Sequence, residues 1–510
     1  MDNNFNTPNQ SFGFESNYVP PSNPVTPKKK APLALIFGIG GGVLAIILIV
    51  TGIFVFKFMN SPKAIVGKAV VKTLDSATDP VGEHLGLTEL RETTYKKPCS
   101  MSATFSVDSV NGAEYLSSIE GAGLRMEAAT DYANKKADAD ISLQWGGTDI
   151  MNCQSYVSGD TIGFACPSLF EGYLSANAKT IGKDYANSVF YDPENPAFDP
   201  EESLELFPQN TTDSPIELYK ERFPEDYATM IKNMTVVKSD TANASDSTEY
   251  DKNNDYYDVT IRNADAQTFL ANLVVLFNET GNMEANESIH ELQKMLREDV
   301  VLIVAIDNTD RICDLYNSSI LTTTEGDVQV DSTISLNGKE DIFSSMEISM
   351  GITEDSVVTS GFTLTREAEQ GDSTYADNWT VTYMPDMETI GLSINYVSTY
   401  NFDEDTMDFN IFVGDTDYSN ISMSGTAAFS NIEKGKSLSI DLSEISVESE
   451  SDGMNLTLSG DCDIYTENVV VKSPTGEARE VFKYDQTQLS ALGNEITQNL
   501  MNSPLINALY

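Results

Sequence analysis

The chain has 510 residues, and its 78 Asp and Glu against 31 Lys and Arg give a formal net charge of −47. Because nucleic-acid binding depends on neutralising phosphates with Lys and Arg, this balance excludes nucleic acid as a partner. Five cysteines in a chain of this length indicate a fold that relies on its core and not on a disulfide framework.

The first 30 residues are rich in Asn, Pro and Ser and lack any apolar period. Such a segment cannot bury enough apolar surface to offset the entropy of ordering. We therefore expect residues 1–30 to form a disordered tail.

A strongly apolar, uncharged run of 26 residues, Ala31 to Phe56, follows this tail. At about 1.5 Å per helical residue it reaches roughly 39 Å, more than the ~30 Å hydrocarbon core of a bilayer. The alternative is a cleavable signal peptide, but the run exceeds the usual h-region of about 7–15 residues and no small-residue cleavage site follows it. The pattern predicts an uncleaved, single-pass transmembrane helix over 31–56.

The orientation of this helix does not follow from the flanking charges, because lysines lie on both sides of it. Residues 1–57 hold two acids and four lysines, which leaves 76 Asp and Glu against 27 Lys and Arg for the rest of the chain. Anionic cytoplasmic lipid attracts basic segments and disfavours a block this acidic. We expect the N-terminus to be cytoplasmic and the C-terminal domain to be extracytoplasmic, at the cell membrane.

Gly38 and Gly42 have the small-xxx-small spacing that lets two membrane helices approach closely. A homodimer through the anchor is one prediction from this spacing. The alternative is that these residues reflect the general frequency of glycine in membrane helices.

Residues 57–98 are expected to form a juxtamembrane helix and linker, because apolar residues between 64 and 74 recur at helical spacing. From Cys99 the period changes to two, which predicts a first β-rich subdomain over 99–262. Its expected strands begin at Cys99 and continue at 122–132, 137–145, 149–157 and 161–166. Helical spacing returns at 215–233.

Two cysteines of this subdomain are brought opposite each other by a predicted turn. The residues from Ser158 to Thr161 fit a two-residue hairpin turn with Gly159 at its first central position. This register places Cys153 opposite Cys166 in a non-hydrogen-bonded pair, where Cα atoms lie ~4.5 Å apart, within the range of a disulfide. We predict a disulfide on the buried side of the hairpin, which the pair shares with the neighbouring side chain of Phe164. The alternative is two free, buried thiols.

Residues 263–510 are expected to hold two helices at 264–278 and 284–298, a long succession of strands from 300 to 467, and a C-terminal helix at 486–501. Apolar residues alternate with Ser, Thr, Asp and Asn along these strands, which is typical of an antiparallel meander with one dry and one wet face. The fold class predicted from this pattern is α+β, with one large antiparallel sheet, or two joined sheets, and helices packed on its apolar side.

This order of elements resembles the lipoprotein-carrier-type (LolA/LppX-like) half-barrels, and it is similar to uncharacterised single-pass surface proteins of Gram-positive bacteria. The resemblance covers roughly residues 61–510 as a pattern and rests on no residue motif. The chain departs from it by having a helix anchor without a lipobox cysteine and about twice the length of one such module. The resemblance implies an apolar cavity that could hold acyl chains, and it transfers no site residues.

Motifs for catalysis are not found in the sequence. The chain has two histidines, no His-Glu-x-x-His, no Cys-x-x-Cys, no Gly-x-Ser-x-Gly and no phosphate-binding Gly-rich loop. We therefore predict no catalytic residues, no metal site and no cofactor. A hydrolase with unrecognised residues is the least favoured reading.

Two functions remain in competition. The first is a membrane-anchored extracytoplasmic module that binds a lipid or another apolar ligand on the dry face of its sheet. The second is a structural or interaction protein of the cell envelope that has a filled core and no small-molecule ligand. The expected partners are the membrane through one helix and either lipid or another envelope protein.

Overall fold

The computed structural model describes residues 61–503, apart from 113, 194–199, 202, 205, 208–214, 240–252, 281–288, 291, 324–325, 355–356, 386–388, 416–419, 450 and 452. The predicted tail, the predicted transmembrane helix at 31–56 and the two glycines Gly38 and Gly42 lie outside these residues. Within the described part, no helix is both long and apolar enough to cross a membrane.

Three helices precede the sheet: α2 (Pro62–Asp75), α3 (Pro80–Leu85) and α4 (Leu87–Lys96). Helix α2 begins after Ser61, whose side chain accepts a hydrogen bond from the Ala64 N–H at 3.2 Å. Val66 and Val70 lie on the buried side of this helix, each 1% exposed. Helices α3 and α4 meet at Gly86, whose φ of 68° is one that glycine adopts without strain.

The strands form one 20-stranded sheet. The first part of the chain supplies β1 (Cys99–Asn111), β2 (Ala122–Asp131), β3 (Lys136–Trp145), β4 (Thr148–Ser158), β5 (Thr161–Ala165), β6 (Tyr173–Asn177), β7 (Thr235–Lys238) and β8 (Asp255–Ile261). The second part supplies β9 (Val300–Ile306), β10 (Ile312–Thr323), β11 (Gly326–Leu336), β12 (Ser345–Glu354), β13 (Val357–Gln370), β14 (Thr374–Met384), β15 (Leu392–Asn401), β16 (Thr406–Gly414), β17 (Ile421–Glu433), β18 (Ser437–Ser449), β19 (Met454–Tyr465) and β20 (Ala478–Glu480).

The pairing of these strands defines one continuous path from edge to edge. The meander runs in chain order from β7 to β19, with each strand antiparallel to the next. Strand β19 pairs with β1, and β2 to β6 then continue to the other edge, where β20 pairs with β6 in parallel. Because β8 pairs with β9, the sheet continues across the predicted boundary at 262/263.

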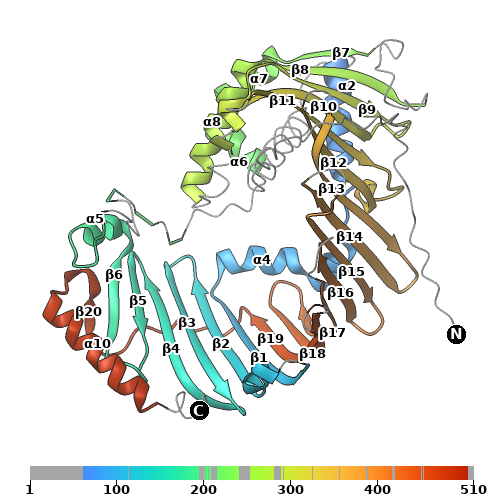
Figure 1. The fold of residues 1–510 in the computed structure, drawn as a ribbon. Helices are drawn as coiled ribbons and strands as arrows, with labels where there is room; N and C mark the ends of the chain where they lie inside the picture. Colours follow the sequence, from blue (N-terminus) through green and yellow to red (C-terminus); the bar gives the residue numbers. More distant parts are fainter. Residues whose placement is uncertain are drawn as a thin grey trace, which may run out of the picture.

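The sheet curves into an open arc, with α4 and α6 on its concave side (Figure 1). The chain leaves β6 at one end of the arc and reaches β7 at the other end. The helices after β6 are α5 (Ile181–Ala186), α6 (Pro215–Arg222), α7 (Pro224–Asn233), α8 (Asn263–Thr280) and the C-terminal α10 (Gln486–Met501). The helix predicted at 215–233 is therefore two helices, which separate at Pro224, and the one predicted at 284–298 lies partly outside the described residues.

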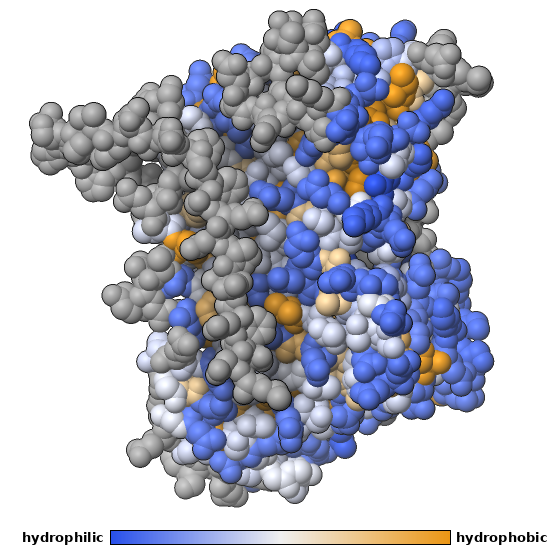
Figure 2. Space-filling model, turned by 90° about the vertical axis from the view of Figure 1, so that its right-hand side faces the viewer, coloured by the Kyte–Doolittle hydropathy of each residue, from blue (hydrophilic) through white to orange (hydrophobic). Residues whose placement is uncertain are grey.

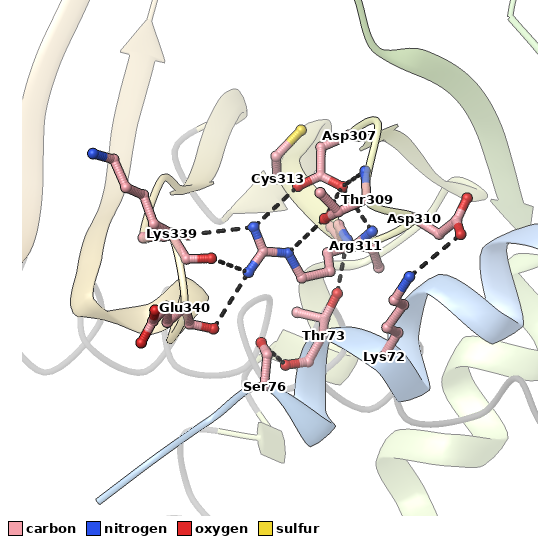
Figure 3. A network of polar contacts seen from close by, with 12 residues as sticks. Lys72, Thr73, Ser76, Asp307, Thr309, Asp310, Arg311, Cys313, Lys339 and Glu340 are labelled. Carbon is pink, nitrogen blue, oxygen red and sulfur yellow. Dashed lines mark hydrogen bonds and ion pairs between the residues drawn. The ribbon is translucent and has the colours of Figure 1, made fainter. Parts of the chain in front are cut away.

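Helix α2 is fastened to the sheet by a network of polar contacts at the β9–β10 turn (Figure 3). The Thr73 hydroxyl accepts a hydrogen bond from the Ile312 N–H at 2.7 Å and donates one to the Ala69 carbonyl at 2.8 Å. Beside it, the Arg311 guanidinium donates to the carbonyl of Lys339 at 2.8 Å.

The charged part of this network centres on Asp307, which pairs with Arg311 at 3.3 Å. Burial alone would raise the pKa of Asp307. Hydrogen bonds from the backbone of Arg311 and from Thr309, together with the charge of Arg311, outweigh burial and lower this pKa. These contacts stabilise the β9–β10 turn, which is followed by Ile312, the residue whose N–H binds Thr73 of α2.

Candidate functional site

One face of the sheet carries mostly apolar side chains. In the meander this face takes alternate residues of each strand, and paired strands carry its side chains in register. The opposite face is polar at the same level, where Thr380 pairs with Asn395 and Asn410 pairs with Ser424. We call the first side the apolar face and the second the polar face.

Helices bury the apolar face at one end of the arc. There α2, α6, α7 and α8 pack on β8 to β12 and form the largest cluster of buried residues. Leu270 of α8 and Leu302 of β9 are both fully buried, at 0% exposure. This end is a filled hydrophobic core.

Two smaller helical covers lie farther along the apolar face. Leu85 of α3 and Leu90 of α4 pack against Tyr400 and Leu438 near one end of β15 and β18. Leu492 of α10 packs against the apolar residues around Cys166 at the far end of the sheet.

A hydrogen bond between two side chains holds α3 in its place. His84 Nε2 lies 2.7 Å from Asp405 Oδ1, and the Tyr400 hydroxyl donates to the same oxygen at 3.1 Å. Burial, followed by the hydrogen bond to Asp405, raises the pKa of Tyr400. The His84 ring also makes an edge contact with Phe402, at 5.3 Å between centroids.

Between these covers, the apolar face carries two rows of side chains that belong to none of the buried clusters of the described residues. We call them the central apolar rows. Row one consists of Trp379, Tyr396, Ile411, Met423, Val447 and Leu456, one from each strand from β14 to β19. Row two consists of Val381, Ile394, Val413 and Ile421, from β14 to β17. All are half-buried except Ile421, which is 45% exposed.

The two rows differ in the residues that precede them on β13. Row two continues without a register shift through β13 and β12 to Ile334 of β11, which is 3% exposed in the filled core. The same line of side chains is thus covered by helices at one end and open at the other. Row one begins next to a charged pair, because Trp379 lies opposite Arg366 of β13.

Arg366 and Asp377 form a largely buried ion pair on the apolar face. The Arg366 guanidinium binds both carboxylate oxygens of Asp377, at 3.0 and 2.9 Å, and donates to the Tyr375 hydroxyl at 2.8 Å. The guanidinium also lies 5.0 Å from the centre of the Trp379 ring. The two charged side chains are only 13% and 15% exposed, so each depends on the other for its charge to be compensated.

The apolar face also continues over β1 to β5. Phe105 pairs with Leu124 across β1 and β2, and their side chains are 41% and 38% exposed. Ile141 of β3 and Phe164 of β5 are similarly open, at 40% and 44%. By contrast, hydrophobic residues form separate small groups among hydrophilic ones on the side of the described part that Figure 2 shows.

The structure brings the two predicted cysteines together. Ser158 pairs with Thr161 and Gln154 with Ala165, and Gly159 has a φ of 61°, so the predicted hairpin and its register are confirmed. The next position outward holds Cys153 and Cys166, whose sulfur atoms lie 2.6 Å apart.

The expectation that the whole cysteine side of the hairpin is buried holds only locally. Cys166 is fully buried and Cys153 is half-buried, but Phe164 on the same side is 44% exposed. The difference arises because α10 covers the cysteines and leaves the next part of the strand open.

Metal chemistry has no candidate in the described part of the chain, where no three His, Cys, Asp or Glu residues lie close enough together to hold an ion. Sequence reasoning missed the Arg366–Asp377 pair. A signal for it exists, because Arg366 follows Phe362 and Leu364 at the apolar positions of one alternating strand.

The described residues thus define an α+β protein built on one large, mostly antiparallel open sheet. No family model matches the chain, and no curated protein matches it. A solved structure of a mutant transferrin-binding protein B from Haemophilus parasuis is 8% identical and covers 73% of this chain and 76% of its own, with a TM-score of 0.10. Intact Ap-TbpB, with N and C lobes, is 7% identical over 73% and 77%, with a TM-score of 0.11. Similarity this low says nothing about the fold or function of this chain.

Proposed function

We propose that this protein is a membrane-anchored, extracytoplasmic module that binds the acyl chain of a lipid along the central apolar rows. The observation that carries the proposal is row two, which runs from the filled core under α2 and α8 onto open strands without changing its apolar character. If this face served only to pack helices onto the sheet, its side chains would become polar where the helices end.

The dimensions of row one suit an acyl chain. Adjacent strands lie about 4.8 Å apart, so the six strands from β14 to β19 span roughly 24 Å across the row. This exceeds the ~15 Å that one leaflet contributes to a bilayer core. Each methylene group that leaves water on binding contributes about 0.8 kcal/mol.

The membrane that holds the predicted anchor would supply this ligand. Five residues separate the predicted membrane span from α2, and this helix is joined to the β9–β10 turn region by the hydrogen bond from the Ile312 N–H to Thr73 and by the Lys72–Asp310 ion pair. In the orientation expected from the sequence, this fastening keeps the domain next to the outer surface of the membrane, which is the source of lipid.

Native mass spectrometry on the full-length protein, extracted from its own membranes with a mild detergent, tests the proposal. We expect a reproducible mass excess that organic extraction releases and that fragmentation identifies as a lipid with an acyl chain. A bare protein mass at every detergent concentration would favour the alternative, an envelope interaction protein without a small-molecule ligand.

A further inference from the structure

The β4–β5 hairpin places two sulfur atoms in contact under the C-terminal helix. Cys153 and Cys166 occupy the pair next to Gln154 and Ala165, and their Sγ atoms are 2.6 Å apart. Counted from the turn, this pair is non-hydrogen-bonded, the class in which Cα atoms approach to ~4.5 Å. A disulfide needs Cα atoms ~4.4–6.8 Å apart, which the separation typical of this class of pair satisfies, and the two sulfur atoms must still approach to about 2.05 Å.

Apolar side chains surround the two cysteines, of which Cys166 is buried and Cys153 is half-buried. Cys166 is 0% exposed and packs with Phe170 and Leu492, and Ile496 of α10 also contacts this cluster. In the thiol form, burial together with the hydrogen bond to Cys166 raises the pKa of Cys153 to about 12.

The other three cysteines lie apart from this pair and from one another in the sheet. Cys99 is opposite Thr130, and Cys462 is opposite Ala103. Cys313 lies at the other end of the arc, in a small buried cluster with Tyr256 and Ala305, where the Asn254 amide donates to its sulfur at 3.2 Å. Strand register therefore selects one pair out of the five cysteines.

We propose that Cys153 and Cys166 form an intrachain disulfide that closes the β4–β5 hairpin beneath α10, and that the remaining three cysteines stay as thiols. The two thiols lose two protons and two electrons as the S–S bond forms. A protein disulfide of a thiol–disulfide oxidase accepts the electrons and is reduced to a dithiol, through a mixed disulfide with one of the two cysteines. This inference rests on the extracytoplasmic location in the proposed function, since such oxidants act outside the cytoplasm.

The bond also has a structural consequence for the apolar face. Leu492 and Ile496 of α10 pack on the cysteine pair, so the covalent link fixes the surface on which this helix lies. Reduction frees the end of β4 from β5 and loosens that surface. The C-terminal helix should then exchange its amide hydrogens faster, and the apolar residues beside it should become more exposed.

Thiol counting on the full-length protein tests the disulfide. The protein is extracted from its own membranes without reductant, denatured, alkylated and weighed. We expect three alkyl groups, and five after reduction. The tryptic peptide from Ala137 to Lys179 carries both cysteines and should be lighter by two hydrogen atoms before reduction. Five alkyl groups without reduction, or a link to another cysteine, would overturn the proposal.

Two variants complete the test. Cys153→Ser should give four alkyl groups without reduction, whereas the matched control Cys462→Ser should give two. Hydrogen exchange in α10 should accelerate on reduction of the wild type and of Cys462→Ser, but should not change on reduction of Cys153→Ser. Equal exchange before and after reduction of the wild type would show that the bond does not hold α10.

The outcome is separable from that of the proposed function. Five free thiols in a protein that releases lipid would contradict the proposed disulfide alone. A disulfide in a protein that carries no lipid would contradict the proposed acyl-chain ligand and leave the disulfide assignment in place.

Discussion

Replacing Arg366 by methionine is expected to lower the free energy of unfolding by about 3–5 kcal/mol, the cost of leaving a buried charge without its partner. Asp377, at 15% exposure, would lose the guanidinium that binds both of its carboxylate oxygens. Methionine keeps most of the volume of the arginine stem, so the loss reports on the charge. Urea denaturation followed by circular dichroism measures it.

A second substitution separates charge from packing at this site. When Asp377 is changed to leucine together with Arg366→Met, no charge is left uncompensated, and most of the lost stability should return. Lys96 and Glu92 form an exposed pair on α4, and Lys96→Met should change stability by less than about 1 kcal/mol. Equal losses for Arg366→Met and Lys96→Met would contradict the burial of the Arg366–Asp377 pair.

Replacing Ile411 by aspartate should reduce the affinity for a pyrene-labelled long-chain fatty acid at least tenfold, which corresponds to about 1.4 kcal/mol. Ile411 lies in row one between Tyr396 and Met423, so the carboxylate would stand in the middle of the proposed acyl path. Covering an ionised group with an acyl chain costs several kcal/mol. Fluorescence titration of the full-length protein in detergent provides the measurement.

Asn410 offers a matched control one residue away. Its side chain is exposed on the polar face of the same strand, so Asn410→Asp adds the same charge outside the proposed path. We expect this variant to bind the fatty acid within about twofold of the wild type. A comparable loss in both variants would point to net charge, and not to the central apolar rows, as the cause.

The local structure of the strands could be predicted because each strand of a sheet with one apolar face alternates apolar and polar residues, and this alternation is visible in the sequence. Alternation over Val328, Val330 and Ile334 predicted β11, and the turn at Gly159 predicted the hairpin register that the structure confirms. The C-terminal helix matches the prediction for 486–501 to the residue, with Asp485 as its N-cap.

The long-range pairing could not be predicted from the same signals. Strand β1 pairs with β19, which lies more than 300 residues later in the sequence, and no pattern in either strand indicates its partner. Strand β20 has three residues, too few for a period, and its parallel pairing with β6 leaves no turn signal. These pairings depend on which edges the completed meander leaves free.

The candidate site could be predicted only in part. Alternation predicted an apolar face, but the parts of that face covered by helices depend on where α4 and α10 pack, which is a tertiary property. The rows themselves arise from register across several strands, so single-strand patterns could not reveal that Trp379 and Leu456 lie on one line. Pro224 was a visible break within 215–233 and marked the division between α6 and α7.

Photo-cross-linking tests the acyl-chain proposal most directly. A fatty acid with a diazirine near its terminal carbon is added to the full-length protein in its own membranes, irradiated, and located by peptide mass spectrometry. The account predicts labelling of row residues such as Tyr396 and Met423 that excess unlabelled fatty acid suppresses. Labelling of Asn395 and Ser424 on the polar face, or labelling that competition does not reduce, would contradict it.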